Sequence, residues 1–182
     1  MITFRLVGKA DFELLHRWLN IDFVSKWYER RKFVYKEVEH KYTTDLYINT
    51  TVQSFLILYD HRPIGYIQMY IIADYPEYAT CIDVPLHTAG MDFFIGDMAY
   101  VGHGLGTEII TSFVDEHVFK TEDVMHCVTG PEPSNKQAIR VYEKAGFRHL
   151  KTVQCPREEE PEYLMVRNKK THEHVVFTAE QS

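Results

Sequence analysis

Three glycines at alternate positions, Gly102, Gly104 and Gly106, stand between an apolar strand pattern and an amphipathic helix pattern. Glycine lets the backbone turn tightly, and its N–H groups can approach an anion because no Cβ stands in the way. A helix that begins at such a turn adds the positive end of its dipole. The segment therefore favours a pyrophosphate site. On these residues alone, the alternative is a glycine-rich helix start without a ligand.

The surroundings of this glycine segment exclude two common nucleotide-binding motifs. A Walker loop continues with Lys and then Ser or Thr, whereas Gly106 is followed by Thr107 and Glu108. A dinucleotide-binding unit begins near the start of its domain and carries an acid about 20 residues further on. Here the glycines follow three or four strand patterns that suggest antiparallel pairing. The chain therefore needs a phosphate-binding fold of another kind.

Apolar periodicity along the chain predicts one α/β (α+β) domain that spans residues 1–182. The predicted strands are residues 2–8, 54–59, 64–73, 91–95, 123–129, 149–155 and 163–167, with a hairpin turn at 60–63. The predicted helices are residues 10–20, 105–118 and 134–146, with a further helix or pair of helices within 27–47. We expect Ser134 to cap the last helix at its start and Gly146 to follow its end.

Composition and charge narrow the classes of function. The net charge is −6 and the pI is near 5.9, which disfavours nucleic acid because a nucleic-acid-binding face is basic. No apolar run approaches the ~20 residues that cross a bilayer. The first residues lack the basic start and apolar core of a signal peptide. We therefore expect a cytoplasmic protein with no membrane partner.

The cysteines and histidines give no sign of a disulfide framework or a metal site. Cys81, Cys127 and Cys155 are odd in number and have no CxxC spacing, so we expect neither a disulfide framework nor a zinc knuckle. Cys127 lies in an apolar strand pattern and is expected to be a buried, inert thiol. His172 and His174 have no third ligand at helical or loop spacing, so we expect no metal.

A second motif follows the glycine segment. Residues 130–135 read Gly-Pro-Glu-Pro-Ser-Asn and lead into a helix pattern that carries Tyr142. Together the two motifs resemble those of the GNAT superfamily of N-acetyltransferases, over about residues 54–167. In that family the pattern Arg/Gln-x-x-Gly-x-Gly/Ala holds the cofactor pyrophosphate, and here Val101 stands where Arg or Gln is usual. The resemblance implies acetyl-CoA as co-substrate and a GNAT fold, a mixed, mostly antiparallel sheet of about seven strands flanked by helices.

Four stretches are similar, more narrowly, to the aminoglycoside 6′-N-acetyltransferases, which confer antibiotic resistance. They are residues 18–20 with 27–28, 63–70, 90–92 and 133–147. The interval from residue 63 to residue 92 matches that family without a gap. This resemblance implies a small-molecule amine as acceptor, and we expect a monomer or a weak homodimer.

The resemblance also implies roles for individual residues. Asp92 falls on the carboxylate regarded as the general base, and Tyr142 falls on the tyrosine that protonates the departing thiolate. The residues expected to contact acetyl-CoA are Phe94, Ile95, Val101, Gly102, His103, Gly104, Leu105, Gly106, Thr107 and Asn135. The residues expected to contact the acceptor are Trp27, Gln68, Glu77 and Asp92.

Acetyl transfer to an amine requires a carboxylate of this kind, because a protonated amine cannot attack. We expect Asp92 to face a wet cleft with an ordinary pKa. Backbone N–H groups of residues 93–95 are expected to polarise the thioester carbonyl, next to a β-bulge at Gly96. The alternatives are a solvated Asp92 that only attracts cations and a Tyr142 that only packs in the core.

Departures from the aminoglycoside family leave the acceptor open. Gly130 stands where that family has Asp, Ala79 and Thr80 stand where it has paired Trp, and the loop before the last strand is longer and acidic at residues 158–160. The rival functions are acetylation of a polyamine, a peptide α-amine or a siderophore hydroxylamine. A further rival, from another class, is a catalytically idle domain that binds acetyl-CoA.

Overall fold

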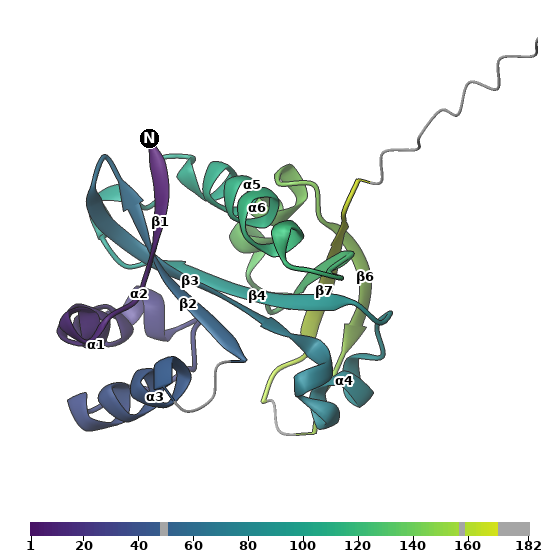
Figure 1. Ribbon diagram of the computed structural model, residues 1–182, viewed down its shortest axis with the longest axis horizontal. Coiled ribbons are helices and arrows are strands. Elements are labelled where there is room, and N and C mark those ends of the chain that lie inside the picture. Colours follow the sequence, from purple (N-terminus) through teal and green to yellow (C-terminus); the bar gives the residue numbers. More distant parts are fainter. Residues whose placement is uncertain (48–50, 157–158, 171–182) are drawn as a thin grey trace, which may run out of the picture.

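A seven-stranded mixed sheet forms the centre of the computed structural model, which describes residues 1–47, 51–156 and 159–170 (Figure 1). The strand order is β1-β2-β3-β4-β5-β7-β6. Within it, β4 and β5 are parallel, and the other neighbouring strands are antiparallel. The predicted fold class, a mixed and mostly antiparallel sheet flanked by helices, is confirmed.

The strands agree with the sequence-based prediction to within a few residues. They are β1 (Ile2–Leu6), β2 (Val52–Tyr59), β3 (Arg62–Ile71), β4 (Thr88–Ile95), β5 (His126–Thr129), β6 (Arg148–Val153) and β7 (Glu162–Asn168). The turn between β2 and β3 is shorter than expected, because Asp60 and His61 both adopt positive φ. That conformation matches the twist of the two strands and closes a tight hairpin.

The helices differ from the prediction in three respects. They are α1 (Phe12–Leu19), α2 (Asp22–Ser25), α3 (Tyr35–Tyr47), α4 (Pro76–Ile82), α5 (Leu105–Glu116) and α6 (Lys136–Lys144), with 3-10 turns at Lys9–Asp11, Ile72–Asp74, Met98–Tyr100 and Val118–Lys120. Helix α3 begins only after Val34, which is 64% exposed. Trp27 lies in a turn before this helix and not in a helix. Asn135, not Ser134, caps α6. Helices α2 and α4 were not predicted, although Pro76 occupies a favoured helix-start position of α4.

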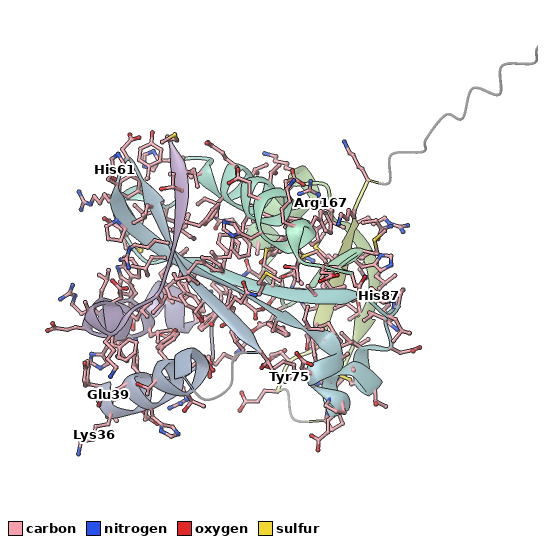
Figure 2. The ribbon with its side chains drawn as sticks, in the orientation of Figure 1. Lys36, Glu39, His61, Tyr75, His87 and Arg167 are labelled. Atoms are coloured by element: carbon pink, nitrogen blue, oxygen red, sulfur yellow. A yellow bond between two sulfur atoms is a disulfide. The ribbon has the colours of Figure 1, made fainter. Side chains whose placement is uncertain are left out.

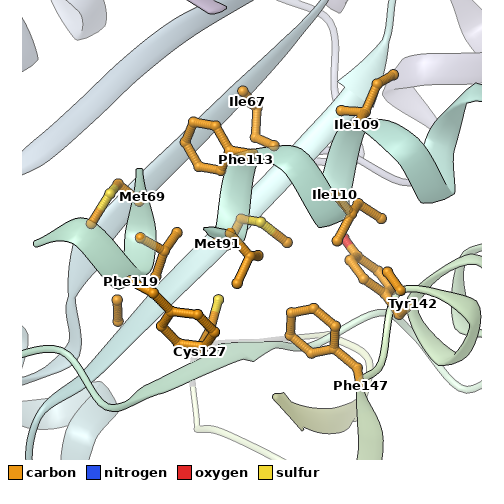
Figure 3. Packing of buried hydrophobic residues seen from close by; sticks show 14 of the residues in the cluster. Ile67, Met69, Met91, Ile109, Ile110, Phe113, Phe119, Cys127, Tyr142 and Phe147 are labelled. Atoms are coloured by element: carbon orange, nitrogen blue, oxygen red, sulfur yellow. The ribbon is translucent and has the colours of Figure 1, made fainter. Parts of the chain in front are cut away.

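Helices cover the two faces of the sheet differently. Helices α1, α2 and α3 lie on one face, and α5 and α6 lie on the other (Figure 1). Because side chains alternate along a strand, β4 contributes Phe94 to the first face and Met91 to the second. On the second face Met91 packs in a buried cluster with Phe113 of α5 and Tyr142 of α6 (Figure 3).

Strands β4 and β5 form the one parallel pair of the described sheet, and they soon separate. Strand β4 pairs with β5 over residues 88–90 alone, whereas its pairing with β3 continues to Ile95. At the end of β4 the N–H groups of Gly96 and Asp97 both donate to the carbonyl of Ile64, at 2.8 and 3.0 Å. Two residues thus oppose one, as in a bulge. A Cβ on Gly96 would lie 2.2 Å from the Trp18 ring, so this position requires glycine.

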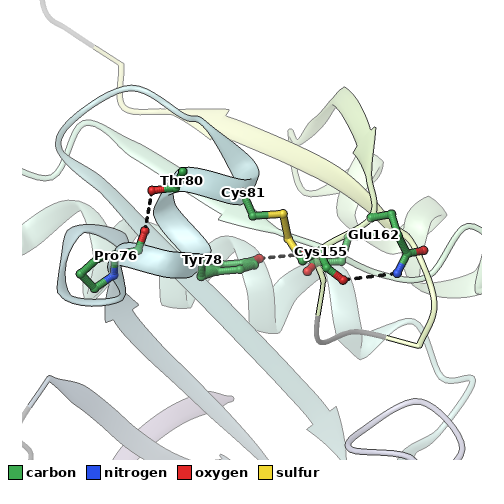
Figure 4. Close-up of a disulfide and its surroundings, with 7 residues drawn as sticks. Pro76, Tyr78, Thr80, Cys81, Cys155 and Glu162 are labelled. Atoms are coloured by element: carbon green, nitrogen blue, oxygen red, sulfur yellow. Dashed lines mark hydrogen bonds between the residues drawn. A yellow bond between two sulfur atoms is a disulfide. The ribbon is translucent and has the colours of Figure 1, made fainter.

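A disulfide joins Cys81 of α4 to Cys155, which follows β6 (Figure 4). The expectation that the cysteines form no disulfide is therefore wrong. The two residues are 74 positions apart in the sequence, and only the fold brings their Cα atoms to 5.8 Å. Tyr75 lies just before α4 (Figure 2), and its hydroxyl hydrogen-bonds Thr51, the residue before β2, at 3.0 Å. The α4 segment is thus tied to the residues next to β2 and to those after β6. The predicted compartment stays a prediction.

No helix in the described part of the chain is long and apolar enough to cross a membrane.

The disulfide closes a long loop, so removing it should destabilise the oxidised protein. We expect the double variant Cys81→Ala, Cys155→Ala to lose about 2–4 kcal/mol of unfolding free energy, because the unfolded chain regains the entropy of the open loop. Urea denaturation with and without a reductant measures this. The reductant should lower the stability of the unsubstituted protein and leave the double variant unchanged. A reductant-insensitive unsubstituted protein would contradict the prediction.

Candidate active site

Two cavities meet beside the open edge of β4. The first, of about 360 Å³, is lined by β4, the glycine segment and α6. The second, of about 810 Å³, is lined by the turn after α2, by β3 and by the segment that leads into β7. The residues that line both cavities are Trp27, Tyr28, Asp92, Gly130, Pro131 and Asn135. A molecule in the first cavity can therefore meet a molecule in the second beside Asp92.

The glycine segment forms an anion-binding turn at the wall of the first cavity. Gly102 and Gly104 have φ of +81° and +80°, a conformation that side chains rarely adopt. Gly104 precedes α5, and no side chain caps the first N–H groups of that helix. These groups and the helix dipole suit a pyrophosphate. A Cβ on Gly106 would lie 2.9 Å from the Val141 side chain, so this glycine also lets α5 approach α6 closely.

The structure brings most of the predicted cofactor-binding residues together. Those that line the first cavity are Phe94, Ile95, Val101, Gly102, Gly104, Leu105, Gly106 and Asn135. Two others, His103 and Thr107, do not belong to that lining. The Asn135 side-chain oxygen accepts the Ala138 N–H at 3.1 Å, so Asn135 also has a structural role as the cap of α6. Its contact with a cofactor stays a prediction.

The exposed edge of β4 presents backbone donors where β5 has diverged. The N–H of Gly96 points toward β3, where it reaches Ile64. Donors of successive residues in a strand point to opposite edges. The N–H groups of Phe93 and Ile95 therefore point toward the edge that β5 has left. They stand where they can donate to an oxygen that gains negative charge.

A chain of hydrogen bonds fixes the Asp92 carboxylate. The Gln68 amide donates to Asp92 Oδ2 at 2.9 Å, and the Tyr66 hydroxyl donates to Gln68 Oε1 at 2.7 Å. The Tyr66 hydroxyl has a single hydrogen and donates it to Gln68. Ser54 must therefore donate to the Tyr66 oxygen, at 2.8 Å. Ser54 and Tyr66 are buried, and the chain of donors runs outward to Asp92. The carboxylate thus has one supported orientation.

The environment of Asp92 raises the pKa of its carboxyl group above the ordinary value. Burial is the main cause, and the Gln68 hydrogen bond and the Lys41 charge oppose it. The expectation of an ordinary pKa for Asp92 is therefore wrong, whereas Asp92 does face the cavities as expected. The aromatic side chains of Tyr70 and Tyr28 line the second cavity together with Asp92. A carboxylate with a raised pKa is a stronger base.

Tyr142 lies on the opposite face of the sheet from Asp92. Its ring packs edge-on against Phe93 and Phe147, and it is 5% exposed. It also lines the first cavity. Burial raises the pKa of its hydroxyl, and a hydrogen bond with Thr129 opposes that rise. Tyr142 is thus both a core residue and a cavity residue, so the packing role is real and the acid role stays a prediction.

The second cavity contains all but one of the residues that were expected to contact the acceptor. Trp27 and Gln68 line the second cavity, whereas Glu77 is exposed on α4 and lies outside the lining of both cavities. The cavity has carboxylates that the sequence did not single out, above all Glu132 and Glu162. Glu132 stands inside the second motif, which could have drawn attention to it. Glu162 opens the last strand and has no local signal.

Cys127 lines neither cavity. Cys127 is buried, and burial raises the pKa of its thiol, as expected for an inert cysteine. Across residues 1–47, 51–156 and 159–170, no group of three His, Cys, Asp or Glu could hold a metal ion. His172 and His174 lie outside the described residues.

Comparison with known proteins identifies a family to which this chain is similar. A family model described as an acetyltransferase (GNAT) domain matches residues 8–155. An aminoglycoside N(6')-acetyltransferase type 1 of Klebsiella pneumoniae is 29% identical over 174 residues, which cover 94% of this chain and 85% of that protein.

Two solved structures of the aminoglycoside acetyltransferase AAC(6')-Ib share the fold. One, in complex with paromomycin and acetyl-CoA, has a TM-score of 0.79 and 27% identity, and the match covers 92% of this chain and 93% of that one. The other, in complex with coenzyme A and kanamycin, has a TM-score of 0.78 and 28% identity, with coverage of 93% and 95%.

Removing the Gln68 donor should raise the pKa of Asp92 further. Gln68 stabilises the charged carboxylate, so Gln68→Met, which keeps the length of the side chain without its amide, should favour the protonated form. Titration of the Asp92 carboxyl carbon by NMR measures the shift. Gln53→Met, at an exposed position on β2, is the control and should leave the pKa as it was. A pKa in Gln68→Met equal to or below the original value would contradict the role given to this amide.

Proposed function

The chain belongs to the GNAT acetyltransferase family, and on that basis we propose that it transfers the acetyl group of acetyl-CoA to the 6′-amine of an aminoglycoside. The observation that carries this proposal is the position of Asp92, whose carboxylate lines both cavities. A base at that junction can act on an amine in the second cavity beside a thioester in the first. Acetyl-CoA supplies the activated acetyl group, and its pyrophosphate suits the backbone of Gly102 to Gly106.

Asp92 acts as the base in this proposal. An aminoglycoside amine is protonated at neutral pH and cannot attack until it gives up a proton. Asp92 accepts that proton, and the free electron pair of nitrogen then forms the bond to the acetyl carbon. The buried surroundings that raise the pKa of Asp92 bring it closer to neutrality, which suits a general base.

Backbone donors and Tyr142 serve the other end of the reaction. The N–H groups of Phe93 and Ile95 stabilise the carbonyl oxygen while the new bond forms. As the carbon–sulfur bond breaks, the Tyr142 hydroxyl donates its hydrogen to the departing sulfur, and the second proton of the acetylated nitrogen restores that hydroxyl. The products are then the neutral amide, the thiol of coenzyme A and a protonated Asp92. Burial makes this hydroxyl a weak acid, so we expect Tyr142 to contribute less than Asp92.

The composition of the second cavity favours a polycationic sugar as acceptor. Six carboxylates line it against two guanidinium groups, those of Arg30 and Arg31. Its aromatic side chains are Trp27, Tyr28, Tyr70, Tyr75 and Tyr78. Aromatic rings offer flat apolar faces to sugar rings, and carboxylates offer hydrogen-bond acceptors to ammonium groups. The likeness to aminoglycoside acetyltransferases supports the same acceptor.

Thiol release from acetyl-CoA across a panel of amines tests the proposal. The panel contains kanamycin, tobramycin, spermidine, a peptide with a free α-amine and a hydroxylamine. We expect turnover on the two drugs, with a KM for kanamycin that rises with salt because ions screen ammonium–carboxylate contacts. Turnover only on spermidine, the peptide or the hydroxylamine would assign the rival acceptor. If no amine of the panel causes thiol release, an idle acetyl-CoA-binding domain is favoured.

Asp92→Asn should reduce turnover of kanamycin by about 10²–10⁴-fold, the usual value of a general base. Tyr142→Phe should cost less, because a thiolate leaves without full protonation. Both variants should keep acetyl-CoA affinity, which calorimetry checks as the control for folding. Turnover near that of the unsubstituted enzyme in Asp92→Asn at neutral pH would show that another group takes the proton.

Gly104→Asp should weaken acetyl-CoA binding, because it places a negative charge beside the phosphates at the start of α5. Gly104→Asn is the matched control, since Asn has nearly the same shape and tolerates positive φ better than most residues. A Cβ at this position meets nothing within 4 Å, so both side chains fit. Calorimetry should show a much larger loss for Asp than for Asn. Equal affinities in the two folded variants would place the pyrophosphate elsewhere.

A further inference from the structure

The turn after α2 contains two consecutive residues in a strained backbone conformation. Glu29 and Arg30 have φ of +59° and +48°, in the left-handed region that side chains rarely adopt. Such strain costs free energy and persists only where surrounding contacts hold it. Trp27 and Tyr28, the two residues before Glu29, line both cavities. The strained turn therefore continues directly from a wall of the site.

An ion pair holds each of the two strained residues. The Glu29 carboxylate pairs with the Lys41 ammonium of α3. The Arg30 guanidinium donates two hydrogen bonds to Glu132, one from Nε to Oε1 at 2.7 Å and one from a terminal nitrogen to Oε2. A two-point pair of this kind fixes direction as well as distance. The turn is thus held by α3 on one side and by the segment after β5 on the other.

The segment that contains Glu132 belongs to the wall that both cavities share. The Glu132 carbonyl accepts the Asn135 N–H at 2.9 Å. Asn135 caps α6, and it lines both cavities together with Gly130 and Pro131. Arg30 and Glu132 are 102 positions apart in the sequence. Their ion pair therefore joins two distant segments that line the passage between the cavities.

The wall on the Arg30 side also packs on the strand that contains the proposed base. The Tyr28 ring lies edge-on to Phe94 of β4, with 5.0 Å between the ring centroids. Asp92 and Phe94 are two positions apart on β4, so their side chains share a face of the sheet. Asp92 lines both cavities with Tyr28. A displacement of the turn would therefore move the ring that lies beside the base.

From these contacts we propose that Arg30 and Glu132 are positioning residues of acetyl transfer, because their ion pair fixes the width of the passage beside Asp92. The inference rests on the proposed function. An amine and a thioester react well only when they are held at about 3–3.5 Å with their orbitals aligned. The two side chains are 41% and 15% exposed, and an ion pair that water reaches adds little to stability. The pair therefore acts on orientation and not on folding.

Steady-state kinetics of Arg30→Gln test this role. The variant loses the two-point pair and also the charge that lies 4.0 Å from Glu160. We expect kcat with kanamycin to fall about tenfold or more, because small displacements of reacting groups are costly. The KM for acetyl-CoA and the Tm should change little.

Arg5→Gln is the matched control. Arg5 makes a similar two-point pair with Asp11, at 2.9 and 2.8 Å, and the two side chains are 49% and 11% exposed. Neither residue lines a cavity. The control variant should therefore lose an equivalent ion pair and keep the kcat and both KM values of the unsubstituted enzyme.

Exchanging the two charges provides a second test. Glu132→Arg alone places two guanidinium groups together and should lower kcat as Arg30→Gln does. Combined with Arg30→Glu, it brings opposite charges together again, and the double variant should recover most of the lost kcat. If Glu132 instead binds the acceptor directly, Arg30→Gln would free its carboxylate and lower the KM for kanamycin with kcat retained. That result would overturn the proposal.

Hydrogen exchange examines the ion pair without any acceptor. Backbone amides within residues 27–31 and 130–135 should exchange faster in Arg30→Gln than in Arg5→Gln. Unchanged exchange in either segment, or a kcat of Arg30→Gln within twofold of the original, would refute the positioning role. If the unsubstituted enzyme acetylates no aminoglycoside, the proposed function fails, and exchange together with the amine that does turn over then decides the role of the pair.

Discussion

Strand β4 pairs with β5 over only three residues, 88–90, and then continues beside β3 alone. This short pairing opens the sheet between its two faces. Through the opening, a molecule held by the glycine segment on the side of α5 can meet one held on the side of α1 to α3. Asp92 stands just beyond the last paired residue, Gly90, so the geometry of the split sets the position of the base.

Burial and charge oppose each other at Asp92. The carboxylate needs dry surroundings to be a stronger base, yet those surroundings favour its neutral form. The hydrogen bonds that run from Ser54 through Tyr66 and Gln68 stabilise the charged form and fix its direction. All three residues come from the β2–β3 hairpin. The hairpin next to β4 therefore influences the pKa and the direction of the Asp92 carboxylate, and the split between β4 and β5 determines which molecules can contact it.

Local patterns predicted the parts of this site that depend on local backbone chemistry. The glycine segment, the helix after it and the helix that ends before Gly146 follow from turn and cap residues, and the structure has them. Contacts between distant segments were not predictable in this way. No spacing rule pairs Cys81 with Cys155, and no motif places Glu162 over Gly130. The raised pKa of Asp92 also depends on side chains from several segments, so its sequence position suggested a solvated group.

A crystal structure of the protein with coenzyme A and kanamycin tests the central claim most directly. We expect the sulfur to lie in the first cavity, beside the Phe93 N–H at the split between β4 and β5. The reacting amine should lie in the second cavity, within about 3 Å of an Asp92 oxygen, as a general base requires. A drug bound with no amine near Asp92, or a sulfur that lies away from the split, would contradict it.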